Sequence, residues 1–494
     1  MDMDERQLVA MDIGTSKIAL TVAKVAGDNV QIIYYRETPS AGIRYSRVIN
    51  PSKASGAIRQ AIGAAEEELG IRITDVIVGL PKYDVQQNTA PLDVKRDAET
   101  CISQEEINEI KESALTTYPL SNKDSEILFG AVAQSFGDED NIQISENDII
   151  GMAPEKLTCN FKVFIGQKKY VKDMRLAFHN AGNLHIRREY FTPDAIAKAV
   201  LYDFELDSGV ALVDIGAGVT SVSIYLGNIM RYYAAIPFGG SSITSDIRTE
   251  CYITEPLAEN IKLAYGACIP EKLMSMSDKT LLINSNDTLP AKQVTVKYLS
   301  EIITARATEI IEAILYRIQE SGLADRLRSG IVITGGGAGL LNIGNLIKDL
   351  SGYNVRTGYP KHIFSAPDKS AGGAHDTSAT ACIGMILMAK TEKIDCPSEE
   401  NAPDRTGKAA AYDNHTMETD SRINSIKDEP VAEPSLDKND GALFPDNGDG
   451  IIRPAKRPSR QKAGKEKQGS QGGGKWTLFS KIKELANEIT DESI

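Results

Sequence analysis

Short apolar runs that end in a polar glycine turn recur along the chain. Residues 210–213 form such a run, which ends at Asp214, and residues 219–225 then largely alternate between β-branched and polar positions. Runs and alternation of this length are typical of strands, so the pattern predicts a strand, a tight turn and a second strand. Residues 9–11 repeat the pattern and end at Asp12. Two copies about two hundred residues apart predict a duplicated α/β domain.

Apolar residues at helical spacing predict helices between the strands. Residues 52–70 carry an apolar residue every three or four positions and stop at Gly70, a residue type that commonly ends helices. The same spacing predicts helices at 192–201, 298–322 and 379–390. Helices that alternate with strands favour an α/β fold.

The pattern changes between residues 84 and 166. A polar stretch comes first, and a capping box at Ser103 then opens a helix. Strand-like runs surround residues 127–129 and 161–165, and a helix predicted at 172–182 returns the chain to the first domain. We therefore expect a small inserted α+β subdomain at 84–166.

Composition shifts after residue 390. Residues 391–474 are dominated by Pro, Asp, Glu, Ser, Asn, Lys and Gly, which predicts a disordered linker. A random coil of this length spans on the order of 50 Å. Basic residues are concentrated at 453–467, near the end of the linker.

Residues 475–490 follow as an amphipathic helix. Its apolar half contains Trp476, Leu478, Phe479, Ile482, Leu485 and Ile489. Lys481 and Lys483 flank this face, where their ammonium groups can reach lipid headgroups. Together with the basic run, the helix predicts binding to an anionic membrane surface. Docking into a groove of a partner protein is the alternative.

Net charge and cysteine usage exclude several classes of protein. The chain has 494 residues and a formal net charge of -13, which argues against nucleic-acid binding by electrostatics. None of the six cysteines forms a C-x-x-C pair, so we expect free thiols in a reducing cytosol rather than a zinc site. The acidic residues 1–5 lack the apolar core of a secretory signal, and no apolar run is long enough for a membrane span.

The two glycine turns are candidates for phosphate binding. Closely spaced glycines let a turn direct backbone N–H groups at an anion, and no P-loop motif is present. An ordinary hairpin with a polar tip is the alternative for either turn alone. If both turns face one ligand, the residues that we expect at the phosphates are Gly14, Thr15, Ser16, Lys17, Gly216, Gly218 and Thr220. Asp12 and Asp214 are the candidates for holding Mg²⁺ through water. A helix that starts at Gly239-Gly240 can also direct its N-terminus at phosphate.

Three motifs in order resemble those of the actin, Hsp70 and sugar-kinase superfamily. Residues 12–15 and 214–220 resemble its two phosphate motifs, and residues 331–338 resemble its adenosine motif. Within that superfamily the chain is most similar to the bacterial cell-division actin FtsA, over roughly residues 8–390. The resemblance implies duplicated actin-like (ribonuclease-H-like) domains around a nucleotide cleft, with ATP and Mg²⁺ as cofactors.

The resemblance also assigns the nucleoside end of the cleft. It implies that Gly335, Gly336 and Gly337 border the nucleoside. Glu259 and Lys262 resemble the Glu-x-x-Lys pair that contacts the ribose and adenine. A surface ion pair between residues three apart on a helix is the alternative for these two side chains.

The resemblance implies a role in cell division. It points to a protein that polymerises on the cytoplasmic face of the inner membrane, binds the C-terminal tail of FtsZ and ties FtsZ filaments to the septum. Other division proteins would bind the inserted subdomain. Thr192 stands where hydrolytic relatives carry Glu or Gln, and Ser221 stands where many carry Asp, so we expect weak or no ATP hydrolysis.

Three alternative functions share the ATP clamp. A small-molecule kinase would need a general base between the domains, and the sequence offers no convincing one. An Hsp70-type chaperone would need a folded β domain after the ATPase part. A pilus-assembly actin shares the inserted subdomain but ordinarily lacks this tail.

These observations divide the chain into eight segments. They are 1–83 and 167–206 for the first domain, 84–166 for the insert, 207–240 and 323–390 for the second domain, 241–322 for its small subdomain, 391–474 for the linker and 475–490 for the terminal helix.

Overall fold

The structure is a computed structural model that describes residues 5–96, 99–138, 143–283, 292–366 and 369–400. Most of the predicted linker, its basic run and the predicted amphipathic helix at 475–490 lie outside these residues. None of the described helices combines the length and the apolar character that a bilayer span needs. The described part of the chain belongs to one compact unit.

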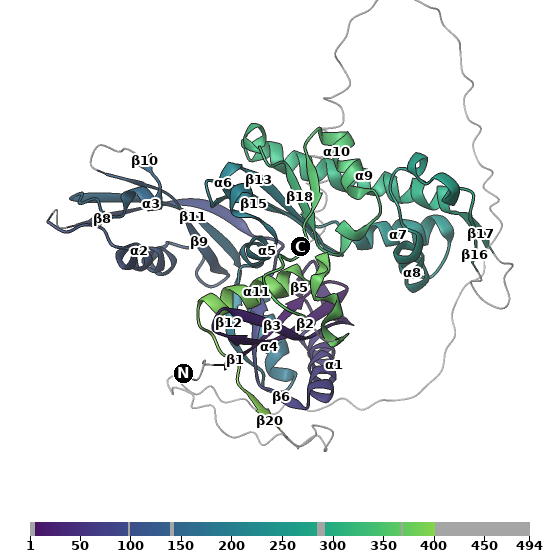
Figure 1. Ribbon diagram of the computed structural model, residues 1–494, viewed down its shortest axis with the longest axis horizontal. Coiled ribbons are helices and arrows are strands. Elements are labelled where there is room, and N and C mark those ends of the chain that lie inside the picture. Colours follow the sequence, from purple (N-terminus) through teal and green to yellow (C-terminus); the bar gives the residue numbers. More distant parts are fainter. Residues whose placement is uncertain (1–4, 97–98, 139–142, 284–291, 367–368, 401–494) are drawn as a thin grey trace, which may run out of the picture. The chain divides into compact units, whose positions relative to one another are not determined.

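Two five-stranded sheets of identical topology form the centre of this unit (Figure 1). The first has the order β12-β7-β1-β2-β3, and its strands are β1 Glu5–Ile13, β2 Lys17–Ala26, β3 Asn29–Pro39, β7 Asp75–Gly79 and β12 His185–Tyr190. The second has the order β15-β14-β13-β18-β19, and its strands are β13 Val210–Ile215, β14 Thr220–Leu226, β15 Ile229–Ile236, β18 Ile331–Thr334 and β19 Val355–Thr357. In each sheet the first three strands in sequence pair antiparallel and the later two join in parallel. The predicted duplication of an α/β domain is confirmed.

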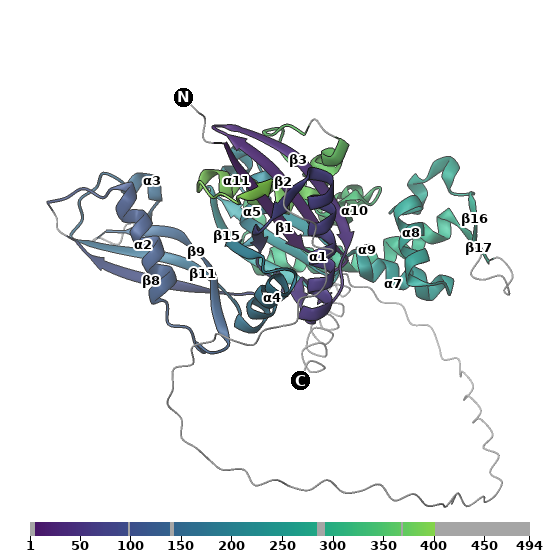
Figure 2. The same ribbon diagram turned by 90° about the horizontal axis from the view of Figure 1, so that it is seen from below.

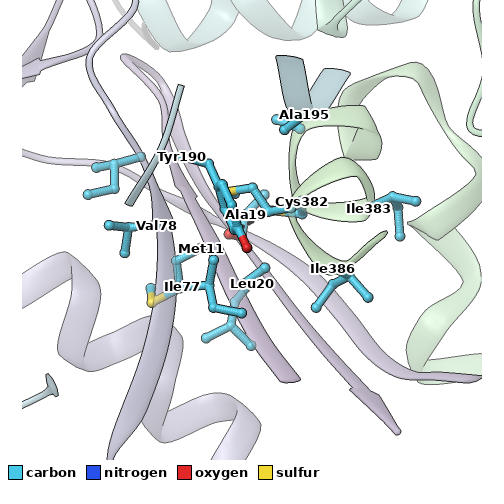
Figure 3. Packing of buried hydrophobic residues seen from close by; sticks show 14 of the residues in the cluster. Met11, Ala19, Leu20, Ile77, Val78, Tyr190, Ala195, Cys382, Ile383 and Ile386 are labelled. Atoms are coloured by element: carbon cyan, nitrogen blue, oxygen red, sulfur yellow. Dashed lines mark hydrogen bonds between the residues drawn. The ribbon is translucent and has the colours of Figure 1, made fainter. Parts of the chain in front are cut away.

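The first sheet is covered by helices from both ends of the folded unit. These are α1 Pro51–Leu69, α4 Lys168–Asn180, α5 Thr192–Val200 and α11 Thr380–Thr391. Helix α11 comes late in the chain, yet it packs on β1 and β2 and also on α5. Figure 3 shows part of this core, with Cys382 and Ile386 of α11 close to Ala19 and Leu20 of β2.

Local signals set the ends of α1. The side chain of Asn50 accepts a hydrogen bond from the backbone N–H of Lys53, and Gly70 ends the helix in the left-handed conformation, as predicted. Helix α4, in contrast, begins at Lys168, four residues before the predicted start at 172. Its first two residues, Lys168 and Lys169, are exposed, so the first turn carries no apolar signal.

Residues 86–167 form a separate four-stranded sheet with two helices on it. The elements are β8 Gln86–Lys95, α2 Gln104–Thr117, β9 Glu126–Gly137, β10 Gln143–Ile144, α3 Glu146–Ile149 and β11 Lys156–Gln167. The sheet order is β10-β9-β11-β8, and α2 runs along one face over a small core of its own (Figure 2). Ser103 caps α2 as predicted by accepting from the N–H of Glu106.

Strand β8, which the sequence did not predict, lies in the polar stretch before the capping box. Its residues are exposed or half-buried, and Pro91 lies within it. An edge strand can be polar on both faces and can tolerate proline, because one side of its backbone needs no ladder partner. The apolar signal of a buried strand is therefore missing here.

The second sheet has its own helices. They are α6 Asp203–Ser208, α7 Gly240–Cys251, α8 Glu255–Tyr265, α9 Val296–Glu320 and α10 Ile343–Ser351. The remaining short strands are β4 Ile43–Arg44, β5 Arg47–Val48, β6 Ile71–Ile73, β16 Thr280–Ile283, β17 Lys292–Thr295 and β20 Ser398–Glu400. The isoleucine face of α9 is buried in the core of this half, as its spacing predicted.

Candidate functional site

The two predicted glycine turns have the same backbone geometry. In the β1–β2 turn the N–H of Gly14 donates to the carbonyl of Lys17 at 2.9 Å, and in the β13–β14 turn Gly216 donates to Val219 at 2.9 Å. A Cβ atom on Gly14 would lie 2.8 Å from the carbonyl oxygen of Lys17, and one on Gly216 would lie 2.7 Å from that of Val219. Both turns therefore need glycine at this position because the returning backbone leaves no space for a side chain.

The turns of the two halves contact one another. A Cβ atom on Gly218 would lie 2.7 Å from the Oγ1 atom of Thr15 in the other turn. Thr15 Oγ1 in turn accepts a hydrogen bond from the N–H of Ser46 at 3.1 Å. The duplicated turns thus meet at one place, although about two hundred residues separate them in sequence.

A cavity of about 380 Å³ lies at this meeting point. Its wall contains nearly all the residues that the sequence nominated for a nucleotide, namely Asp12, Gly14, Thr15, Ser16, Lys17, Asp214, Gly216, Gly218, Gly240, Glu259, Lys262, Gly335, Gly336 and Gly337. This volume is within the usual range for small-molecule sites, roughly 300–1,000 Å³. The structure therefore gathers residues from several elements and turns of both halves around one space.

Two nominated residues, Thr220 and Gly239, are not among those that line the cavity. The Thr220 hydroxyl is buried and donates to the carbonyl of Phe238 at 2.9 Å. A Cβ atom on Gly239 would lie 2.3 Å from the carbonyl oxygen of Gly216 and 2.7 Å from that of Ala217. Thr220 joins the second turn to the backbone that follows β15, and Gly239 lies against the backbone of that turn. Both residues therefore contact protein atoms and do not line the cavity.

Glu259 and Lys262 form the predicted pair on one face of α8. The Lys262 ammonium lies 2.8 Å from Glu259 Oε2 and also donates to the carbonyl of Gly240 at 3.0 Å and to the hydroxyl of Thr244 at 2.8 Å. Glu259 and Lys262 form an ion pair between residues three apart, as in the alternative interpretation. They also line the cavity, as contact with a nucleotide would require. The Lys262 ammonium fixes α8 against the first turn of α7.

Lys17 has an acidic partner that the sequence did not indicate. Its ammonium lies 2.6 Å from Glu37 Oε1 on β3, and Glu37 also lines the cavity. Burial would raise the pKa of the Glu37 carboxyl, but the ammonium of Lys17, with hydrogen bonds from Ser378 and Tyr35, outweighs burial, and the pKa is lowered. Glu37 therefore keeps its negative charge and holds Lys17 in place.

Lys82 is a second cavity residue that the sequence did not indicate. It follows β7, and its ammonium lies 2.9 Å from Asp214 Oδ2 and 3.8 Å from Asp12 Oδ2. Burial alone would lower the pKa of Lys82, but the two carboxylates raise it above its ordinary value. A signal was available, because β7 pairs in parallel with β1 and the carboxyl ends of parallel strands meet at one sheet edge.

The donors around Asp12 and Asp214 do not fit a divalent cation at that place. Within the described residues no group of three or more His, Cys, Asp or Glu side chains could hold a metal ion. The two carboxylates share the ammonium of Lys82, which lies closer to Asp214 and already compensates one of their two negative charges. A Mg²⁺ ion beside this ammonium would meet like-charge repulsion.

Thr192, which the resemblance aligns with the hydrolytic Glu or Gln of relatives, does not line the cavity. Thr192 is fully buried, and its hydroxyl donates to the carbonyl of Leu80 at 2.9 Å. The nearby Asp194 does not line the cavity; it accepts from the hydroxyl of Tyr225 at 3.5 Å, and burial raises the pKa of its carboxyl to about 7.

The acidic residues that do line the described cavity are Asp12, Glu37, Asp214 and Glu259, and each pairs with a lysine.

Comparison with known proteins places the site in a family context. The family model described as "Cell division protein FtsA" matches residues 211–384. The "Cell division protein FtsA" of Borreliella burgdorferi is 30% identical over 388 residues, which cover 78% of this chain and 91% of that protein. That of Neisseria meningitidis serogroup B is 29% identical over 407 residues, which cover 81% and 94% of the two chains.

The structural comparison agrees on the fold. The structure titled "PilM-PilN type IV pilus biogenesis complex" superposes with a TM-score of 0.53 and 16% identity, and the match covers 77% of this chain and 98% of that one. At this identity the similarity shows the actin-like fold alone.

Proposed function

The chain belongs to the FtsA family of cell division proteins, and from this premise we propose that it binds ATP in the cavity between its two halves. One observation carries the proposal: the two matching glycine turns, from β1–β2 and β13–β14, contact each other at a cavity of about 380 Å³. Turns of this geometry direct backbone N–H groups at anionic oxygens. Gly14 to Lys17, Gly216 and Gly218 would hold the phosphates.

The nucleoside would lie against the glycines that follow β18. Gly335, Gly336 and Gly337 line the cavity, as do Glu259 and Lys262 of α8. Gly335 has φ +82°, and a Cβ atom there would lie 2.3 Å from Asp214 Oδ1, so only glycine fits between the turn and the nucleoside wall. Glu259 and Lys262 would contact the ribose and adenine.

ATP would act as a bridge between the halves. The two turns belong to different sheets. A ligand that contacts both turns binds the closed arrangement of the two halves more tightly than the open one, and this difference in affinity favours closure. The buried Thr192 leaves the hydrolytic position without a carboxylate or amide, so ATP would stay bound long enough to support polymerisation.

The membrane part of the proposal rests on sequence. The amphipathic residues 475–490 and the basic run at 453–467 would hold the protein on the inner face of the cytoplasmic membrane at the division site. A polymer anchored there would bind FtsZ tails in many copies, and multivalency would strengthen the attachment of FtsZ filaments. Other division proteins would meet the insert.

Equilibrium binding of ATP tests the first part. Gly336→Asp places a negative charge in the cavity, and a Cβ atom there meets only the Lys17 ammonium, at 3.9 Å, so the variant should fold. We expect a loss of affinity of about tenfold or more, equivalent to roughly 1.4 kcal/mol. Gly63→Asp, at an exposed position of α1, is the matched control and should bind like the unaltered chain. Equal binding by both variants, or no binding by the unaltered chain, would refute the site.

Flotation with anionic liposomes and ATP tests the second part. We expect the full chain to float and a chain that ends at Gly474 to stay at the bottom of the gradient. FtsZ added to the full chain should float with it. If the full chain binds ATP but neither length floats, the terminal helix binds a protein partner and the membrane part of the proposal is wrong.

A further inference from the structure

Lys82 lies between the carboxylates of the two halves. Asp12 belongs to β1 of the first sheet and Asp214 to β13 of the second, and the ammonium of Lys82 is 3.8 Å from one and 2.9 Å from the other. The lysine side chain is 12% exposed, and those of Asp12 and Asp214 are 20% and 7% exposed. All three groups also line the cavity.

Hydrogen bonds from both halves of the protein hold the backbone at and just before Lys82. The carbonyl of Lys82 accepts a hydrogen bond from the hydroxyl of Tyr233, a buried residue of β15 in the second half. Two residues earlier, the N–H of Leu80 donates to Tyr190 at 2.8 Å and its carbonyl accepts from Thr192. The ammonium is therefore positioned by folding, before any ligand arrives, which reduces the entropy lost when it contacts one.

The carboxylates of Asp12 and Asp214 together form a negatively charged site that would attract a cation. Two buried carboxylates repel one another unless a positive charge lies between them. Mg²⁺ would need these same oxygens, directly or through its water shell. The ammonium already occupies the place next to Asp214, and it reaches across the junction of the halves as a bridging cation would.

We propose that Lys82 replaces the divalent cation in this chain, so that ATP binds with little dependence on Mg²⁺. The ammonium joins Asp12 to Asp214 and presents its remaining N–H groups to the phosphates. Lys17 also lines the cavity and adds a second ammonium, which is paired with Glu37. The inference rests on the proposed binding of ATP in this cavity.

ATP affinity of the unaltered full chain, with Mg²⁺ and with EDTA, tests the proposal directly. We expect the two dissociation constants to agree within about threefold, which is well below 1.4 kcal/mol. If ATP binds only when Mg²⁺ is present, the proposal about Lys82 is overturned while the proposed ATP site stands. If ATP binds under neither condition, both fall.

Two variants locate the effect. Lys82→Met should lose about tenfold or more of its ATP affinity in EDTA, and Mg²⁺ should restore much of it, because the free carboxylates can then hold the ion. Lys172→Ala, which removes an exposed lysine of α4, should behave like the unaltered chain. Lys82→Arg keeps the charge and should keep binding in EDTA; Mg²⁺-dependent binding by this variant would contradict the proposal.

Calorimetric titration with Mg²⁺ alone gives a readout that needs no nucleotide. The unaltered chain should show no binding heat, and folded Lys82→Met should bind the ion. A clear Mg²⁺ isotherm with the unaltered chain would overturn the assignment of Lys82 as the resident cation.

Discussion

Replacement of Gly384 by alanine probes how closely α5 and α11 approach. A Cβ atom at Gly384 would lie 1.8 Å from the carbonyl oxygen of Ala195 and 2.3 Å from its carbonyl carbon. Ordinary contact begins at about 3.4 Å, and the obstacle is helix backbone rather than the end of a flexible side chain. Both helices are buried around the contact, so α11 can make room only if it separates from α5 as a unit.

The expected free-energy change is the difference between two terms. Overpacking a core costs roughly 1–3 kcal/mol when side chains can adjust, and a backbone clash of this depth belongs at or above the upper end. Alanine gains back about 1 kcal/mol over glycine inside a helix. The net destabilisation should therefore be about 2 kcal/mol or more, which corresponds to a fall of roughly 2–4 °C in Tm for a folded unit of this size.

Gly63→Ala is the matched control. Gly63 lies inside α1, is exposed, and has no atom within 4 Å of the Cβ position. The same chemical change should stabilise the protein there by about 0.5–1 kcal/mol.

The assay is urea or thermal unfolding of both variants beside the unaltered chain, with ATP binding as a second readout. Helix α11 contributes Thr380 and Ala381 to the cavity wall, so its displacement should also weaken binding of ATP by Gly384→Ala. Equal melting temperatures for the two variants would mean that α5 and α11 do not cross as closely as the structure has them.

Three further changes test individual residues. Burial raises the pKa of Asp194 to about 7, although the hydrogen bond from Tyr225 acts in the opposite direction. The folded state therefore binds this proton more tightly than the unfolded state, and the free energy of unfolding should fall as pH rises from about 4 to about 7. Asp194→Asn should flatten this pH dependence, as measured by urea unfolding across that range. Thr220→Val removes the hydrogen bond to Phe238 and should lower the free energy of unfolding by about 1 kcal/mol in urea unfolding, with less than about a twofold change in ATP affinity. Gly335→Ala places an alanine in a left-handed backbone conformation and brings its Cβ atom into a clash with an Asp214 oxygen. The change should weaken ATP binding by about tenfold or more in equilibrium dialysis. Unaltered binding would show that this turn does not hold the nucleoside.

Local signals allowed much of the fold to be predicted. The two turns after Asp12 and Asp214 depend on glycines within four residues of the strand end, and the structure shows both turns with the same hydrogen bond. The start of α2 at Ser103 and the end of α1 at Gly70 are equally local, because a cap involves only the neighbouring turn. The duplication itself was readable because the same local pattern occurs twice.

Strand β8, at the polar edge of the insert, could not be predicted from local signals. Strand β8 is defined by its partner β11, which comes about sixty residues later, and its exposed faces impose no alternation of apolar residues.

The sequence by itself determined the turns, most helices and many of the residues that line the cavity, because each of these depends on neighbours within a few positions. Only the tertiary structure decided which charges meet. Lys82 reaches Asp214 across 132 positions of sequence, Glu37 reaches Lys17 from the paired strand β3, and Thr220 turns its hydroxyl to Phe238 instead of the cavity. Such pairings follow from the sheet order and the packing of two halves, which no local pattern specifies, and they decide where positive charge is available to a ligand.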